Sequence, residues 1–192
     1  EARVALSDLE LLLSLQGSHT WVGTGMDAGS EELSGEVRLA PGTRAVLTQL
    51  QGPDSVTGLW LDLAESAWHE VELEVTVDGR SRVRMPVADF FAMGRGGSVP
   101  TRSLMVGRDA TGSLYCVFPM PFADTLEVAL EHTGEAGEVS VGYRVRWAQQ
   151  PPRPGSGVFG ASLATATETV PGEDFEFLAL EGAGTWVGTF AD

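Results

Sequence analysis

The side chains with the clearest ligand-binding chemistry lie in a short aromatic stretch between Met85 and Gly94. Asp89, Phe90 and Phe91 stand next to one another there, directly before a glycine-rich loop. Adjacent rings beside a carboxylate suit a sugar, because the rings stack on it and the carboxylate accepts hydrogen bonds from its hydroxyls. The alternative is that both rings plug one end of a core while Asp89 caps a helical turn. Physical reasoning alone favours that second interpretation.

A second aromatic stretch reads Leu-Tyr-Cys-Val-Phe-Pro-Met-Pro-Phe at residues 114–122. Pro119 and Pro121 cannot donate hydrogen bonds, so the strand ladder must end there and leave its aromatic side chains at a rim. Packing at that rim is the simplest role for them. Cys116 is the single cysteine, which excludes an intrachain disulfide, and its apolar neighbours predict a buried structural thiol rather than a nucleophile.

Complete catalytic and metal-binding motifs are missing from the sequence. It contains no Gly-x-Ser-x-Gly elbow, no phosphate-binding glycine loop and no Gly-x-Gly-x-x-Gly opening a helix. His19, His69 and His132 stand singly, without a second histidine or a cysteine at metal-ligand spacing. We therefore predict no catalytic residue, no metal site and no cofactor from the residues themselves.

The charge of the chain limits its partners. The sequence has 192 residues, a formal net charge of −15 and no lysine. Phosphates would be repelled, which argues against nucleic acid or an anionic membrane as a partner. No apolar run is long enough to span a bilayer, so we expect no membrane insertion. The acidity fits a neutral ligand or a solubility requirement, and the compartment stays unknown.

The elements that would position these side chains are β-strands. Apolar and polar residues alternate with a period of two, and turn residues recur every 8–12 positions, as in an antiparallel sandwich or jelly roll. Asp78-Gly79 between two alternating runs predicts a hairpin. Brief helical turns are possible at 7–15 and 87–93. The expected strands are 36–39, 44–48, 55–63, 70–77, 80–85, 113–118, 125–132 and 138–147.

The pattern divides the chain into three parts. Residues 1–148 are expected to form an all-β antiparallel jelly-roll domain, 149–157 a Pro/Gly linker, and 158–192 a tail with strands at 161–170 and 175–180. The tail repeats Leu-x-Gly-x-x-Thr-Trp-Val-Gly-Thr, found at 15–24 and again at 180–189. This repeat favours the first strands of a second jelly roll. The alternative is an edge strand of the first.

Several motifs, in order along the chain, resemble glycoside hydrolase family 172. They are Gly-Pro-Asp-Ser-Val-Thr-Gly-Leu-Trp at 52–60, the Asp78-Gly79 hairpin, Asp-Phe-Phe at 89–91, Phe-Pro-Met-Pro-Phe at 118–122 and Gly-x-Gly-Thr-Trp-Val-Gly at 182–188. The resemblance implies a double jelly roll, symmetric oligomers and retaining hydrolysis of furanosides by two glutamates. Their carboxyls would lie roughly 5 Å apart.

The catalytic segments of that family, Gly-Glu-Gly-Asp and Gly-Thr-Glu-Asp-Tyr, do not occur in this sequence. We therefore expect a non-catalytic jelly-roll module that binds carbohydrate or assembles into a homo-oligomer. The alternative is the N-terminal part of an active retaining hydrolase whose glutamates lie outside this chain. The ligand-binding candidates are Asp89, Phe90, Phe91, Trp60 and Tyr115.

Overall fold

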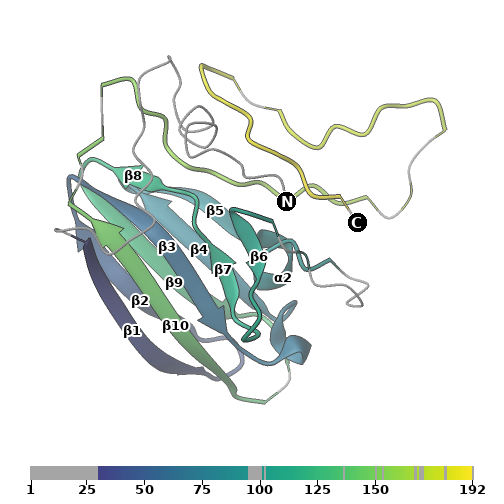
Figure 1. Cartoon of the computed structure of the whole chain (residues 1–192). Coiled ribbons are helices and arrows are strands. Elements are labelled where there is room, and N and C mark those ends of the chain that lie inside the picture. The colour runs from purple at the N-terminus through teal and green to yellow at the C-terminus, as the bar shows by residue number, and fades with distance from the viewer. Residues whose placement is uncertain are drawn as a thin grey trace.

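The computed structural model describes a β-sandwich of two antiparallel sheets (Figure 1). The described residues are 30–94, 101, 103–135, 137–149, 151–152, 154–166, 168, 171–179 and 181–191. The predicted helical turn at 7–15, the first copy of the repeat, His19 and the glycine-rich loop at 95–98 lie outside them. Within these ranges, no helix is long and apolar enough to cross a membrane.

One sheet has six strands. Its order is β1-β10-β3-β7-β6, and the short strand β8 pairs with the other end of β3. The bounds are β1 Ser30–Leu39, β10 Val139–Ala148, β3 Asp54–Asp62, β7 Leu114–Cys116, β6 Val106–Arg108 and β8 Met120–Phe122.

The other sheet has four strands in the order β2-β9-β4-β5. A 3-10 turn and one turn of α-helix lie in the connections on either side of the β4–β5 hairpin. The bounds are β2 Arg44–Gln51, β9 Thr125–His132, β4 Val71–Val77, β5 Arg80–Pro86, η1 Glu65–Ala67 and α2 Val87–Phe90.

The strand order is that of a jelly roll. The chain changes sheet at each of its first three strand connections, and its first and last strands pair with each other through β1 and β10. Short strands wound between two sheets in this way leave each sheet with one buried face and one outer face. The predicted all-β jelly-roll fold is confirmed.

Period-two alternation explains why these segments form half-buried strands. In β4 the residues alternate between buried and half-buried from Val71 to Val77, and the apolar ones are at most 1 % exposed. The β4–β5 hairpin turns through Asp78 and Gly79, both with positive φ, as a two-residue hairpin of the predicted type requires. The Asp78 carboxylate also accepts hydrogen bonds from the backbone N–H groups of residues 123–125, which ties the hairpin to the start of β9.

Strand β8 was not predicted, because Pro121 was expected only to end the ladder. The ladder of β7 does end at Cys116, but the chain then pairs again with β3, placing Pro121 opposite Ser55. Three residues beside the end of a longer strand can form such a pairing without the proline nitrogen as a donor.

The tail lies outside the two sheets as an extended segment (Figure 1). No strand occurs among its described residues, although the sequence predicts strands at 161–170 and 175–180. The first part of the tail touches the sandwich: Phe159 and Ala161 pack against the core, and the Ala161 N–H donates to the Arg82 carbonyl of edge strand β5. The linker boundaries and the second jelly roll stay predictions.

Candidate functional site

The five predicted ligand-binding residues fall into two separate groups. Trp60 of β3 and Tyr115 of β7 are direct partners across two neighbouring strands of the six-stranded sheet. Asp89, Phe90 and Phe91 lie on and just after α2, beyond the end of β5. The first group is on the outer surface and the second belongs largely to the core.

Trp60 and Tyr115 point away from the core because their neighbours along each strand point into it. Leu59 and Leu61 beside Trp60 are fully buried, as are Leu114 and Cys116 beside Tyr115. Side chains directly opposite each other in an antiparallel pair share a face and have Cβ atoms about 5 Å apart. Strand β10 adds two arginines to this face, and β1 adds one glutamate. We call this set the Trp60 face: Trp60, Tyr115, Arg144, Arg146 and Glu32.

Gly58 determines where the indole ring of Trp60 lies. A Cβ added at Gly58 would stand 2.4 Å from both Cη2 and Cζ3 of that ring, far inside van der Waals contact. Residues 58 and 60 share a face, so the benzenoid edge of the indole folds back along its own strand over the missing side chain. A glycine at this position is therefore a packing requirement of the Trp60 face.

Two arginines of β10 lie over the Trp60 ring. The guanidinium carbon of Arg144 is 4.2 Å from the ring centroid, and that of Arg146 is 5.2 Å away. Both are within the distance at which the ring quadrupole attracts a cation. Arg146 is also neutralised, because its Nε and one terminal nitrogen donate to one oxygen of Glu32 at 3.2 and 3.1 Å. Arg144 forms no ion pair with any residue that the structure describes.

Tyr115 is fixed at its far end, where its hydroxyl donates to the backbone carbonyl of Ser103. The Ser103 hydroxyl in turn donates to the Val106 carbonyl at 2.6 Å, which closes the turn before β6. Next to Trp60 on β3, the Asp62 carboxylate accepts a hydrogen bond from Ser113. The Tyr115 ring is therefore held at its hydroxyl, and two outward-facing rings with donors beside them suit a polar ligand with an apolar face.

Phe90 and Phe91 close one end of the sandwich. Phe91 is 0 % exposed and Phe90 is 8 % exposed, and their rings meet edge to face at 4.9 Å. Phe159 from the tail joins them, with its ring 6.3 Å from that of Phe90 and 5.7 Å from that of Phe118. The two rings therefore lie where the packing interpretation places them and do not form an open stacking surface.

Asp89 does not cap α2 through its side chain. The helix begins after Pro86 without any side-chain cap, and the turn is closed by backbone bonds to the carbonyls of Val87 and Asp89. Oδ2 of Asp89 is buried and has no hydrogen-bond partner among the described residues. The role of this carboxylate as a sugar ligand stays a prediction.

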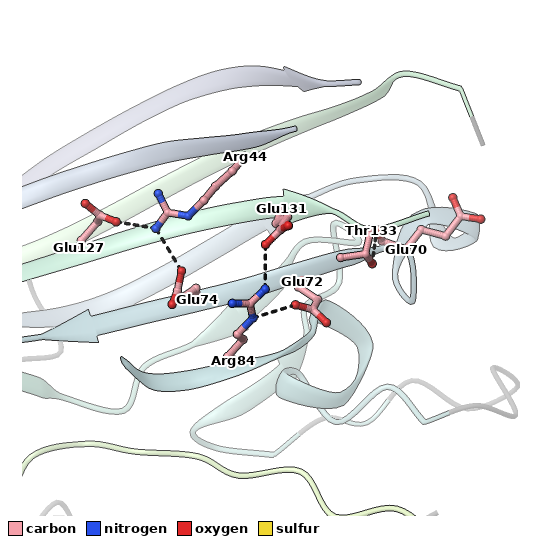
Figure 2. Close-up of polar contacts among 8 residues, drawn as sticks. All are labelled: Arg44, Glu70, Glu72, Glu74, Arg84, Glu127, Glu131 and Thr133. Carbon is pink, nitrogen blue, oxygen red and sulfur yellow. Dashed lines mark hydrogen bonds and ion pairs between the residues drawn. The ribbon is translucent and has the colours of Figure 1, made fainter. Parts of the chain in front are cut away.

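A second polar surface covers the outer face of the four-stranded sheet (Figure 2). We call it the charged ladder: Arg44, Glu72, Glu74, Arg84, Glu127 and Glu131. Arg44 donates to Glu127 at 2.6 Å and to Glu74 at 3.1 Å. Arg84 donates to Glu131 at 3.0 Å and to Glu72 at 3.2 Å. Each arginine therefore joins a glutamate of β9 to one of β4.

Ion pairing raises the pKa of both ladder arginines above the ordinary value. For Arg44 the hydrogen bond to Glu127 is the main cause, and for Arg84 it is the bond to Glu72. Every glutamate in the ladder is thus bound to a permanent cation. Such an arrangement is an ion-pair network across all four strands of this sheet, which holds charged side chains in place on its surface.

Cys116 and His132 are both buried in the core. Burial raises the pKa of the Cys116 thiol to about 12, so the predicted inert thiol is what the structure shows. His132 is completely buried at the end of β9, with Nδ1 3.3 Å from the Leu39 carbonyl oxygen. Among the described residues, no group of three or more His, Cys, Asp or Glu side chains could hold a metal ion.

Comparison with known families identifies this sandwich. Residues 30–141 match the family described as "GH172 domain-like", which is more than half of the chain. The chain belongs to this family. The matched GH172 region begins with the first residue of β1 and ends within β10, so it corresponds to the jelly roll.

Two of the solved structures similar to this GH172 domain are phage capsids. The capsid of Helicobacter pylori bacteriophage KHP30 has a TM-score of 0.37 and 11 % identity, covering 63 % of this chain and 88 % of that one. The cyanophage Pam1 capsid has a TM-score of 0.36 and 15 % identity, covering 71 % and 96 %. The crystal structure of FLHE has a TM-score of 0.29 and 15 % identity, covering 64 % and 100 %. No curated protein matches significantly in sequence.

The glutamates of the charged ladder are paired with arginines, whereas the sequence resemblance implies two glutamates acting as acid/base and nucleophile in a GH172 enzyme. A retaining glycosidase needs one carboxyl to protonate the leaving group and another to attack the sugar. Glu72 and Glu131 both bind Arg84, and Glu74 and Glu127 both bind Arg44. One oxygen of each ladder glutamate is thus occupied by an arginine. Sequence reasoning also missed Arg144, because nothing in the alternation of β10 marks which strand it will face.

Proposed function

We propose that this GH172 jelly-roll module is non-catalytic and binds carbohydrate on the Trp60 face. One observation carries the proposal: an outward-facing aromatic pair from β3 and β7 with an arginine of β10 over the indole. Aromatic rings take up the apolar faces of sugar rings, while neighbouring guanidinium and carboxylate groups bond to the hydroxyls. This surface combines all three kinds of group on short, paired strands.

The acidity of the chain agrees with such a ligand. With a formal net charge of −15, it has little attraction for a polyanion but no reason to repel a neutral saccharide. The Trp60 face also carries most of its polar groups in fixed positions, because Arg146 is bound to Glu32 and Tyr115 to Ser103. Fixed groups reduce the entropy that binding a flexible sugar would cost.

A glycan array followed by calorimetry on the hits tests the proposal. We expect the full chain to bind at least one saccharide class and Trp60→Ala to reduce that affinity about tenfold or more, since stacking on one ring contributes roughly 1–3 kcal/mol. Trp186→Ala is the matched control, because Trp186 is an exposed tryptophan of the tail. Binding that survives Trp60→Ala, or an array without any signal, contradicts the proposal.

A second candidate is a self-assembling structural subunit, and the tail favours it. Monomers rarely expose contiguous apolar surface without a partner for it. Phe177 and Trp186 of the tail approach each other at 6.3 Å and both remain exposed. The exposed large apolar side chains of the tail are Val158, Leu163, Phe175, Phe177, Leu178, Trp186, Val187 and Phe190.

Light scattering tests the assembly candidate. We expect an oligomer whose mass falls toward that of the 20.3 kDa chain when Phe175→Ser and Phe177→Ser are combined. Leu104→Ser is the control, because Leu104 is at least as exposed as Phe175 and Phe177 but lies outside the tail. A monomer at every concentration contradicts self-assembly.

A third candidate follows from family membership alone. As the N-terminal part of a retaining hydrolase, this jelly roll would position catalytic glutamates that lie outside the chain. Turnover of aryl furanosides by this chain alone would contradict the non-catalytic proposal. The third candidate instead predicts turnover only when the chain is joined to a segment that carries Gly-Glu-Gly-Asp and Gly-Thr-Glu-Asp-Tyr.

A further inference from the structure

We infer that the Trp60 face recognises a saccharide residue that carries a carboxylate, and that Arg144 is the group that binds it. This inference rests on the proposed function and names the ligand class for the same surface. It starts from the two guanidinium groups that lie over the indole ring, of which only that of Arg146 is bound to a carboxylate.

Most of the described arginines of the two sheets pair with a glutamate: Arg38, Arg44, Arg84, Arg108 and Arg146. Arg80 and Arg82 of edge strand β5 and Arg144 of β10 form no ion pair with a described residue, and of these three only Arg144 lies over an aromatic ring. In a chain with more than twice as many acidic as basic residues, a carboxylate is easily supplied. Arg144 lies in the middle of the surface formed by β1, β10 and β3. Among the described residues, its guanidinium contacts the indole ring of Trp60 but no carboxylate.

The carboxylates nearest Arg144 on this face are bound to other groups: Glu32 to Arg146, Glu36 to Ser140 and Asp62 to Ser113. Directly opposite Arg144 on β3 is Trp60, and directly opposite it on β1 is Ser34. The one glutamate close to the ring, Glu32, accepts two hydrogen bonds from Arg146. A guanidinium presents several N–H donors in a planar fork that fits a carboxylate in a bidentate manner. The Trp60 face therefore has, beside its aromatic ring, an arginine that no carboxylate of the described residues binds.

The ligand that fits this pair of groups is a uronic acid residue. Its ring offers C–H groups to the indole and its carboxylate reaches the guanidinium, a combination that a neutral sugar cannot complete. The overall charge of −15 sets a limit on the ligand, because a polyanion would be repelled from the rest of the surface. One carboxylate at the stacked residue, on an otherwise neutral saccharide, satisfies both conditions.

The test compares two oligosaccharides that differ only in their terminal residue, glucuronic acid or glucose. Binding to the full chain is measured by calorimetry, with Arg144→Gln to remove the charge and Trp60→Ala to remove the ring. Arg84→Gln is the matched control, because it makes the same change of charge on the charged ladder of the other sheet. Circular dichroism establishes that each variant is folded.

We expect the glucuronic acid ligand to bind at least about tenfold more tightly than the glucose ligand, as a hydrogen bond between charged groups allows. Arg144→Gln should abolish this preference, and Arg84→Gln should change neither affinity. If both oligosaccharides bind with equal affinity and Trp60→Ala abolishes the binding, this inference is overturned but the proposed function stands. A preference retained in Arg144→Gln also overturns it. Failure of both ligands to bind removes the inference together with the proposed function.

Discussion

Replacing Gly58 by alanine tests how the Trp60 face is built. The new Cβ would stand 2.4 Å from Cη2 and Cζ3 of Trp60, whereas carbon atoms in contact are about 3.5–4.0 Å apart, so the indole must move by more than about 1 Å. The ring can yield because it is a side chain, but it then leaves its position beside Arg144. The strand cannot yield, because Gly58 pairs with β10.

Two opposing contributions determine how far Gly58→Ala changes the free energy of unfolding. Overpacking of a fixed ring costs roughly 1–3 kcal/mol, and the lost arginine–indole contact lies within that range. Replacing a glycine by alanine recovers about 0.4–1 kcal/mol through the unfolded chain. We therefore expect Gly58→Ala to destabilise the domain by about 1–2 kcal/mol, which lowers the urea midpoint by about 0.5–1 M for a slope near 2 kcal/mol/M.

Urea unfolding followed by circular dichroism measures this change, and the NMR signal of the Trp60 indole N–H reports the displacement. Gly137→Ala is the control, because no atom lies within 4 Å of a Cβ added at Gly137. If Gly58→Ala is as stable as Gly137→Ala and the Trp60 signal does not shift, the indole does not lie over Gly58. The geometry of the Trp60 face would then be refuted.

Three further predictions concern the core and the hairpin. Phe91→Ala should lower the free energy of unfolding by about 3–5 kcal/mol in urea titrations, because the ring is completely buried; a loss under 1 kcal/mol would refute its place in the core. Burial raises the pKa of Cys116 to about 12, so a thiol reagent at pH 8 should modify Cys116 only after unfolding, and rapid native modification would contradict its burial. Burial tends to raise the pKa of Asp78, but three backbone N–H donors outweigh it and hold the pKa below its ordinary value. The stability it adds is therefore present above about pH 4 and lost as pH falls through the folded pKa, so the stability difference between wild type and Asp78→Asn should be largest above about pH 5 and should shrink as pH falls through that folded pKa.

The local strand pattern could be predicted from the sequence, because alternation reports which side of a strand is buried. Residues 125–132 form β9 with the predicted bounds, and Asp78-Gly79 forms the predicted hairpin turn. Strand β8 could not be predicted in the same way, since three residues with a central proline carry no alternation. Its pairing depends on β3, which lies more than sixty residues earlier in the chain.

The sequence predicted some residues of the candidate site but not how they come together, because a sequence shows residue types but not which strands become neighbours. Trp60 and Tyr115 were named as separate candidates, and only the pairing of β3 with β7 brings them together. Arg144 joins them through the pairing of β3 with β10, a contact between residues more than eighty positions apart. Phe159 reaches the aromatic end of the core from the tail, and a lone phenylalanine after a Pro/Gly-rich run gives no signal of that contact.

The most direct test of the account is an NMR titration of the full chain with the tightest saccharide from the array. If the Trp60 face is the binding site, the largest shifts will fall on the indole of Trp60 and on the backbone amides of Tyr115 and Arg144. The charged ladder of the other sheet will stay unshifted. Shifts centred on Asp89 and α2 would contradict the account, and so would saturable binding that leaves the Trp60 signal unchanged.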